Sequence, residues 1–324
     1  MRRFLSRVLP LLLSFGLIFN CTGCSTILVL AGKARENSEA SSSIISESSA
    51  SSGIISTPVP TEDGDLRAFY TDVANAESVT VMVYMIGSDL ESEDGSATDD
   101  LLEMADAALS ENVHLVLQTG GTEIWWNDVC TDDESERFVI ENGDMTLLQS
   151  LGSVNMTDAD TLSDFIRFSA ESYPADRYEL ILWDHGGGTM TGFGYDELYE
   201  DTSLTLSSLS TALYNGGVQF DFIGFDACLM ATYEMAAHMA SYADYMVASE
   251  ELEPGIGWNY QGWIGDLAAN PEMSSADIAV SIADQFMAAC LSDNPNDYLS
   301  QSVINLSACL LYTSPSPRDR SLSR

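Results

Sequence analysis

The sequence predicts an α/β protein with a mostly parallel sheet and helices on both faces. Short apolar runs alternate with segments of helical periodicity between residues 79 and 306. Strands separated by helices of about 10–15 residues need crossover connections, and these connections make neighbouring strands parallel. The runs are almost continuously apolar, as expected for strands buried on both faces. In addition, two chemically distinctive motifs directly follow such runs, at the sheet edge where α/β proteins bind ligands.

The predicted elements follow one another in a regular order. The first strand is Val79–Ile86 (VTVMVYMI), and a Gly-Ser-Asp turn leads from it to a helix around Asp99–Leu109. A strand at His114–Gln118 precedes a small meander, whose turns contain Asp, Asn and Gly. The meander consists of Glu123–Trp126, Phe138–Ile140 and Met145–Leu148. The remaining predicted helices are Thr161–Ser172, Thr205–Asn215, Leu229–Ala240 and Ser275–Cys290, and the remaining strands are Tyr178–Trp183, Phe220–Phe225, Tyr245–Ala248 and Ser302–Leu306.

Residues 1–23 have the features of a lipoprotein signal peptide. Three arginines lie within the first seven residues, and the apolar run Val8–Phe19 follows them. The run is shorter than the roughly 20 residues of a transmembrane helix. Residues 21–24 (CTGC) resemble a bacterial lipobox, with Cys24 as the lipid-modified residue. We therefore expect a protein anchored by lipid on the extracellular face of a bacterial membrane; the alternative is an ordinary cleaved signal peptide and a secreted protein.

The folded domain is expected over residues 67–308, between two segments of different character. Residues 24–66 are predicted to form a flexible stalk, since residues 36–56 contain ten serines and almost no hydrophobic periodicity. Residues 309–324 resemble the translation of a sequencing adapter, and a genuine polar tail is the alternative. If the resemblance holds, the native chain continues beyond about Ala308 and the domain is incomplete.

The charge balance argues against nucleic acid as a partner. Twelve Lys and Arg stand against 50 Asp and Glu, a net charge of −38, and such a surface cannot neutralise phosphates. Between residues 36 and 308 the cationic side chains are Arg67, Arg137, Arg167 and Arg177. This composition suits an exported protein or one with a cationic ligand, although a solvated acidic surface is an equally good interpretation.

The cysteines indicate a thiol that is free to do chemistry. Three remain in the expected domain, Cys130, Cys228 and Cys290, and an odd number in an oxidising exterior leaves at least one outside an internal disulfide. The chain contains neither a Cys-x-x-Cys nor a His-Glu-x-x-His spacing beyond the CTGC of the leader, so we expect no metal site of these types.

Two motifs follow predicted strands. In Trp183–Gly188 (WDHGGG) a strand leads into a histidine and three glycines, which allow close backbone approach and free amide N–H groups. In Gly224–Met230 (GFDACLM) a strand leads to Cys228, which is predicted to open the next helix, where the helix dipole favours thiolate. Taken singly, the first motif could be a flexible turn, and Cys228 could be a small buried hydrophobic residue.

Taken together, the motifs resemble the clostripain family of caspase-like (clan CD) cysteine peptidases. The resemblance covers residues 79–260 and rests on four motifs in the same order. They are Tyr84–Glu91 (YMIGSDLE), Leu182–Gly188 (LWDHGGG), Gly224–Met230 (GFDACLM) and Ala248–Tyr260 (ASEELEPGIGWNY). It implies a caspase-like fold and cleavage of polypeptides after Arg or Lys.

The resemblance also implies roles for individual residues. His185 and Cys228 would form a catalytic dyad that requires no third member, and the N–H groups of Gly186 and Cys228 would hold the oxyanion. Asp226 would form the acidic base of the pocket for the basic side chain. Glu251 and Glu253, with Glu250, would be secondary contributors to substrate binding, although each taken alone is better explained as a surface charge.

The chain departs from the family in two respects. Family members are often cleaved after a basic residue between the histidine and the cysteine, but residues 186–227 contain no Lys or Arg, so we expect no self-processing there. No cofactor is expected. Some family members bind calcium, but Asp89–Asp100 does not fit an EF-hand loop because Glu occupies two ligand positions and Gly95 comes one place late. Calcium dependence stays open.

Two other function classes share features of these motifs. A serine esterase could use the His-Gly-Gly-Gly sequence as an oxyanion loop, but it also needs a Gly-x-Ser-x-Gly nucleophile elbow, which the chain does not contain. The alternative that remains is a catalytically silent surface lipoprotein that binds cationic peptides on the same fold. It differs from the enzyme only in the reactivity of Cys228.

Overall fold

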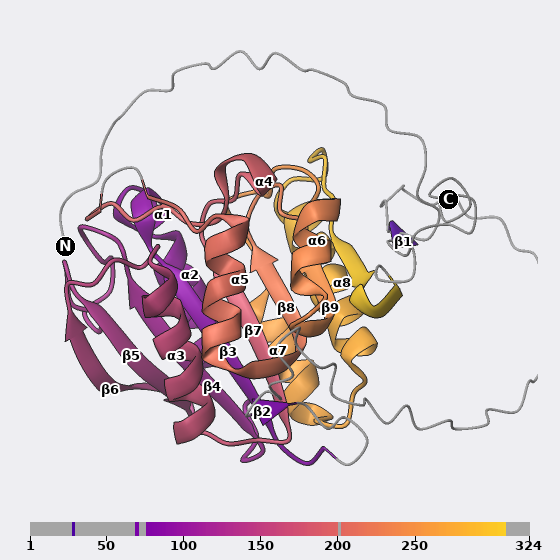
Figure 1. The fold of residues 1–324 in the computed structure, drawn as a ribbon, viewed down its shortest axis with the longest axis horizontal. Helices are drawn as coiled ribbons and strands as arrows, with labels where there is room; N and C mark the ends of the chain where they lie inside the picture. The colour runs from indigo at the N-terminus through magenta and orange to yellow at the C-terminus, as the bar shows by residue number, and fades with distance from the viewer. Residues whose placement is uncertain (1–27, 30–68, 71–75, 200–201, 309–324) are drawn as a thin grey trace, which may run out of the picture.

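The computed structural model describes residues 28–29, 69–70, 76–199 and 202–308, which form one α/β domain (Figure 1). The eight longer strands are β3 (Val79–Ile86), β4 (Val113–Gly120), β5 (Ser135–Glu141), β6 (Asp144–Gly152), β7 (Arg177–Trp183), β8 (Val218–Asp226), β9 (Ala243–Ala248) and β10 (Ser302–Asn305). The helices are α1 (Ser88–Ser92), α2 (Ser96–Asp106), α3 (Ala159–Ser172), α4 (Gly188–Thr191), α5 (Leu206–Gly216), α6 (Tyr233–Met239), α7 (Tyr260–Ala269) and α8 (Ser275–Asp293). Two strands of two residues each, β1 (Leu28–Val29) and β2 (Phe69–Tyr70), pair with β10 and β8.

The sheet is mixed, with a parallel centre. The longer strands lie in the order β10-β9-β8-β7-β3-β4-β5-β6. Strands β9, β8, β7, β3 and β4 are parallel to one another, whereas β5, β6 and β10 are antiparallel to their neighbours. The carboxyl ends of the parallel strands meet at the upper edge in Figure 1, together with α1 and α4. The predicted mostly parallel arrangement is confirmed.

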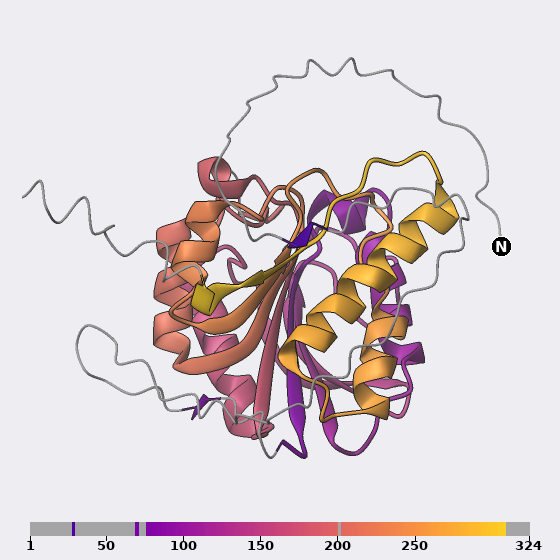
Figure 2. The same ribbon diagram turned by 90° about the vertical axis from the view of Figure 1, so that its right-hand side faces the viewer.

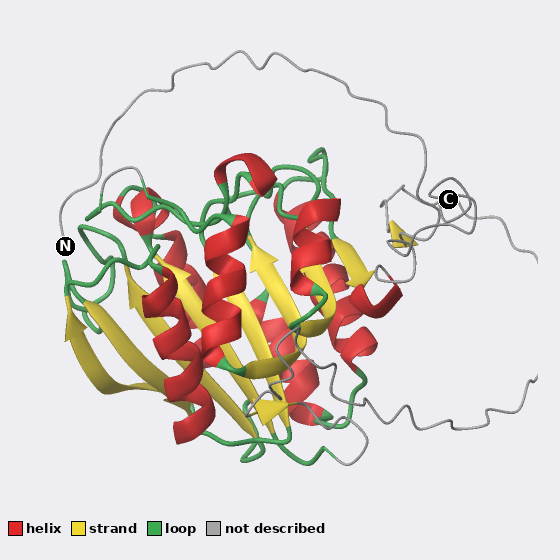
Figure 3. Ribbon diagram, in the orientation of Figure 1, coloured by secondary structure: helices red, strands yellow, loops and turns green. Residues whose placement is uncertain are grey.

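Helices cover both faces of the sheet, as Figures 2 and 3 show. Helices α3, α5 and α6 pack on one face around Phe165, Leu209 and Met235. Helices α2, α7 and α8 pack on the other around Leu101 and Trp263. Strands β3 and β7 are buried along their whole length, which explains their nearly continuous apolar sequences.

Most predicted elements are present, and two predictions are wrong. The segment Glu123–Trp126 forms a loop instead of a strand: the N–H of Trp125 donates to Asp132 Oδ1 at 2.8 Å, and that of Trp126 to Glu91 Oε1 at 2.6 Å. Carboxylates therefore take the hydrogen bonds that a sheet neighbour would take. The helix predicted over Leu229–Ala240 begins four residues late, at Tyr233.

The predicted leader with Cys24, most of the stalk and the tail 309–324 lie outside the described residues. In the part of the chain that is described, no helix is both long and apolar enough to cross a membrane.

Candidate active site

The two predicted catalytic residues follow neighbouring parallel strands. The register of β7 and β8 pairs Trp183 with Asp226, and the N–H of Asp184 donates to the carbonyl of Asp226 at 3.3 Å. His185 and Cys228 therefore each lie two residues beyond a matched pair of strand ends. The sequence motifs predict that the two residues lie at the same sheet edge, next to each other only if β7 and β8 are adjacent strands. The structure shows that these two strands pair directly.

Gly186 brings the two strand ends into direct backbone contact. A Cβ atom at this position would overlap the carbonyl oxygen of Cys228, so only glycine fits without a shift of the backbone. Gly186 faces Phe193 in an isolated antiparallel bridge, whose hydrogen bonds are made by the flanking residues. They run from Gly187 N to the carbonyl of Gly192 and from Gly194 N to that of His185, both 2.9 Å. The N–H of Gly186 takes no part in this pair, as an oxyanion donor requires.

Cys228 does not open a helix, contrary to the sequence-based expectation. Leu229 follows it with a φ of 65°, a left-handed conformation that a branched side chain rarely adopts. Helix α6 starts later because the side chain of Thr232 caps it, accepting a hydrogen bond from the N–H of Met235. The helix-dipole argument for a thiolate at Cys228 is therefore wrong.

Backbone groups of a neighbouring loop hold the sulfur instead. The N–H of Glu253 donates to Cys228 Sγ at 3.3 Å, and the thiol lies 3.9 Å from the carbonyl oxygen of the same residue. The N–H of Leu229 donates to the carbonyl of Glu251 at 3.0 Å, which fastens the loop beside the cysteine. Backbone groups of residues 251–253 therefore position the sulfur.

The other two described cysteines differ from Cys228 in burial. Cys130 and Cys290 are buried, whereas Cys228 is partly exposed, and none of the three forms a disulfide. Burial raises the pKa of both Cys130 and Cys290 to about 12. Only the thiolate is nucleophilic, so these two thiols are inert near neutral pH.

Asp226 lies in a cluster of buried acidic and aromatic side chains. Its Oδ2 accepts hydrogen bonds from the Tyr260 hydroxyl at 2.9 Å and from the N–H of Trp258 at 3.3 Å. Burial raises the pKa of Asp226 to about 6, against the lowering effect of the hydrogen bond from Tyr260. Burial, together with the charge of Asp226, holds the pKa of Glu253 well above its usual value. Neither carboxyl oxygen of Glu253 has a hydrogen-bond partner among the described residues.

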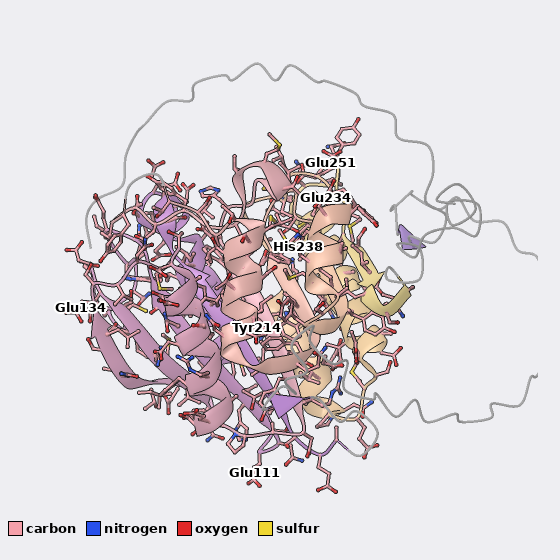
Figure 4. All side chains as sticks on the ribbon, in the orientation of Figure 1. Glu111, Glu134, Tyr214, Glu234, His238 and Glu251 are labelled. Atoms are coloured by element: carbon pink, nitrogen blue, oxygen red, sulfur yellow. The ribbon has the colours of Figure 1, made fainter. Side chains whose placement is uncertain are left out.

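The three glutamates predicted to make secondary contributions to substrate binding differ in exposure. The side chain of Glu251 is exposed at the upper edge of the molecule, near the start of α6, as Figure 4 shows. The carboxyl oxygens of Glu253, in contrast, are buried, so the surface-charge interpretation does not hold for this residue. Glu250 is exposed and accepts a hydrogen bond from Ser302 at 2.5 Å.

An acidic cavity adjoins the cluster. It has a volume of about 350 Å³ and lies between α2 and the loop at Gly255 and Ile256. The acidic residues that line it are Asp99, Asp100, Glu103 and Asp106. Asp100 also accepts a hydrogen bond from Trp183 Nε1 at 2.6 Å. Neither Cys228 nor Asp226 is among the lining residues of this cavity, and Asp226 is only 6% exposed.

In the structure, the ring of His185 has a hydrogen-bond partner that the sequence does not predict. Its Nε2 lies 2.6 Å from Asp89 Oδ1, and both side chains are a little under half exposed. Asp89 belongs to α1, directly after β3, which is the other neighbour of β7. The Tyr84–Glu91 motif contained the residue but carried no signal for its contact.

Comparison with known proteins identifies the family. A sequence model of the clostripain family (peptidase C11) matches residues 83–310, more than half of the chain. The chain belongs to the clostripain family. Clostripain from Hathewaya histolytica is 32% identical over 123 residues, which cover 33% of this chain and 23% of clostripain. The matched region thus spans about a quarter of that relative.

Solved structures of clostripain-family proteins share the fold. A secreted C11 cysteine protease from Bacteroides thetaiotaomicron, in complex with an irreversible peptide inhibitor, has a TM-score of 0.59 at 24% identity. The alignment covers 72% of this chain and 67% of that one. An inactive zymogen C11 protease from Parabacteroides distasonis has a TM-score of 0.56 at 23% identity, over 76% of this chain and 69% of that one. At these identities the likeness establishes the fold.

Proposed function

We propose that the protein is an exported cysteine endopeptidase that cleaves polypeptides after Arg or Lys through Cys228 and His185. The observation that supports this proposal is the register of β7 and β8: Trp183 pairs with Asp226, and His185 and Cys228 each follow this pair by two residues. Membership of a cysteine peptidase family supports the same chemistry.

The reaction divides into two steps. The thiolate of Cys228 attacks the scissile carbonyl carbon, and the N–H groups of Gly186 and Cys228 hold the oxyanion that forms. Protonated His185 gives its proton to the departing amine as the C–N bond breaks, which leaves a thioester. Water then attacks the thioester, its proton passes to neutral His185, and the thiolate leaves. Acid and base roles alternate on a single imidazole.

A preference for basic side chains rests on the acidic cluster. Asp226 lies two residues before the nucleophile, and burial raises its pKa only to about 6, so its carboxyl group is ionised at neutral pH. A guanidinium paired with this carboxylate gains a charge-assisted hydrogen bond of about 1.5–3 kcal/mol. Glu251 at the exposed rim would attract cationic substrates from solution, an effect that salt screens.

Substitution of the dyad tests the proposal in the full chain. A fluorogenic Arg peptide should be turned over by wild-type protein and by Cys290→Ala, which removes a buried thiol. Cys228→Ala and His185→Ala should abolish turnover. Undiminished turnover in Cys228→Ala would exclude the dyad. Binding of Arg peptides without turnover by wild-type protein would favour the silent lipoprotein instead.

Specificity has its own test. Asp226→Asn should reduce cleavage after Arg by roughly ten- to a hundredfold, the equivalent of one charge-assisted hydrogen bond. Cleavage profiling on a peptide library should show Arg or Lys before the scissile bond. A preference for Asp or Asn there would show that the pocket assignment is wrong.

For localisation, we propose anchoring through lipid on Cys24, supported by the succession of charged, apolar and Thr-Gly-Cys residues in the leader. A C11 protease of the same fold is described as secreted. Expressed in a bacterial host, wild-type protein should fractionate with membranes, and Cys24→Ala should lose this association. Release of wild-type protein with an N-terminus at residue 25 or later would contradict anchoring.

A further inference from the structure

The carboxyl ends of three adjacent strands each carry one polar residue of the candidate site. In the sheet, β7 lies between β8 and β3. Cys228 follows β8, His185 follows β7 and Asp89 follows β3. The order of the strands therefore lines up a thiol, an imidazole and a carboxylate. The imidazole already contacts the carboxylate, with 2.6 Å between His185 Nε2 and Asp89 Oδ1.

The backbone around Asp89 is fixed independently of this contact. Ser88 has a φ of 49°, a left-handed conformation that is uncommon outside glycine. The Oγ of Ser88 donates to Asp184 Oδ1 at 2.7 Å, and its N–H donates to the carbonyl of Gly121 at 3.1 Å. Ser88 is thus tied on one side to the residue that precedes His185. Unfavourable backbone conformations that their surroundings maintain are concentrated at functional sites.

Asp184, the other carboxyl group next to His185, is occupied elsewhere. It is buried, accepts hydrogen bonds from Ser88 Oγ and from the N–H of Tyr195, and has a pKa that burial raises to about 7. Asp184 therefore accepts hydrogen bonds from Ser88 and Tyr195, whereas Asp89 contacts the imidazole ring. Among the described residues, Asp89 is the carboxylate that forms a hydrogen bond or ion pair with the ring.

We propose that Asp89 is a positioning residue for His185. Because a carboxylate only accepts, the hydrogen bond places a proton on Nε2 and leaves Nδ1 to exchange a proton with the substrate. The contact also restrains the orientation of the ring. The carboxylate of Asp89 also stabilises the imidazolium that protonates the departing amine.

The inference rests on the proposed Cys228–His185 dyad. The Asp89–His185 pair itself is expected to contribute little to folding stability. With both side chains a little under half exposed, the pair contributes at most about 1 kcal/mol to folding. Substitutions of Asp89 should therefore leave the fold intact. Their effect should appear in proton transfer, where orientation and charge at the imidazole matter most.

The test compares Asp89→Asn and Asp89→Glu with Asp94→Asn, which removes the same charge from an exposed position in the turn after α1. Asp89→Asn should lower kcat by about 10- to 100-fold, with KM within about twofold. The alkaline side of its kcat profile should move to lower pH, and Asp89→Glu should recover part of kcat. Asp94→Asn should match wild type in each measurement.

Alkylation of Cys228 by iodoacetamide distinguishes an effect of Asp89 on the His185 imidazole from an effect on the Cys228 thiol. Its rate should change less than twofold in Asp89→Asn, since the thiol is held by Glu253 and not by the imidazole. Wild-type kcat and pH profile in Asp89→Asn, alongside inactive Cys228→Ala, would overturn the inference and leave the dyad standing. So would a loss confined to KM, or an equal loss of alkylation. Active Cys228→Ala would instead refute the dyad itself.

Discussion

Gly186 and Cys228 touch through their backbones, because any side chain at position 186 would overlap the carbonyl oxygen of the cysteine. Gly186→Ala should therefore cost about 1–3 kcal/mol in stability and remove most peptidase activity. Gly265→Ala is the matched control: this glycine lies in α7 with nothing near its missing Cβ, and alanine favours helix. Thermal melts and turnover of an Arg peptide would measure both. Wild-type activity in Gly186→Ala would show that the close approach is dispensable.

Binding of basic substrates should weaken in acid. The pKa of Asp226 is raised to about 6, so the carboxylate is lost as the pH falls through 6 and KM for an Arg peptide should rise. Tyr260→Phe removes a hydrogen bond that lowers this pKa and should move the acid side of the kcat/KM profile to higher pH. An unchanged profile in Asp226→Asn would contradict the assignment.

Glu179 should make the fold less stable as pH rises. Both of its carboxyl oxygens are buried without a hydrogen-bond partner among the described residues, and burial raises its pKa to about 8. Between about pH 4.5 and 8 the folded protein keeps a proton that the unfolded chain releases, so unfolding free energy falls across this window. Urea titrations at pH 5, 6.5 and 8 should show a shallower fall in Glu179→Gln. Glu111→Gln, at an exposed site labelled in Figure 4, should follow wild type.

Arg177 should be essential for folding but not for catalysis. It is fully buried at the start of β7, pairs with buried Asp221, and donates to the carbonyls of Pro271 and Met273. Arg177→Met would leave the buried Asp221 carboxylate without its ion-pair partner. It should lower the free energy of unfolding by about 3–5 kcal/mol. In a double-mutant cycle, Arg177→Met with Asp221→Leu should be less destabilised than Arg177→Met alone. Equal stability of single mutant and wild type would contradict this account.

The domain is expected to resist self-cleavage by the proposed peptidase activity. Of its described arginines, the side chains of Arg137 and Arg177 are buried, and Arg167, 45% exposed, lies in helix α3. A protease needs an extended segment, so prolonged incubation should leave residues 76–308 intact, with trimming near Arg67 as the expected cut. Intact-mass measurement would show it. A cut after Arg167 would mean that α3 opens locally.

The sequence was sufficient where a local pattern determines structure. Strand β3 was predicted with its observed bounds because eight consecutive residues are suited to burial on both faces. Helix α6 was predicted too long because the apolar periodicity extends back to Leu229, whereas Thr232 provides the cap. The cap is a polar residue inside an otherwise helical pattern, and it competes with that pattern in determining where the helix begins.

Contacts between distant segments were beyond the sequence. The bond between Asp89 and His185 depends on β3 lying next to β7 and on the left-handed conformation of Ser88. The loop that holds Cys228 Sγ depends on the fold of residues 249–258. Neither relationship is expressed in spacing or composition, because each is decided by strand order and loop path.

The strand order also determines when the candidate site can assemble during synthesis. Strand β3 takes its place between β4 and β7, and Cys228 follows β8, so ribosomal synthesis delivers the carboxylate, then the imidazole and the thiol last. Pairing of parallel strands so distant in the chain is slow compared with local folding. A nascent polypeptide therefore has no assembled site until most of the sheet exists. Under the proposed function, the topology itself delays proteolysis until folding is nearly complete.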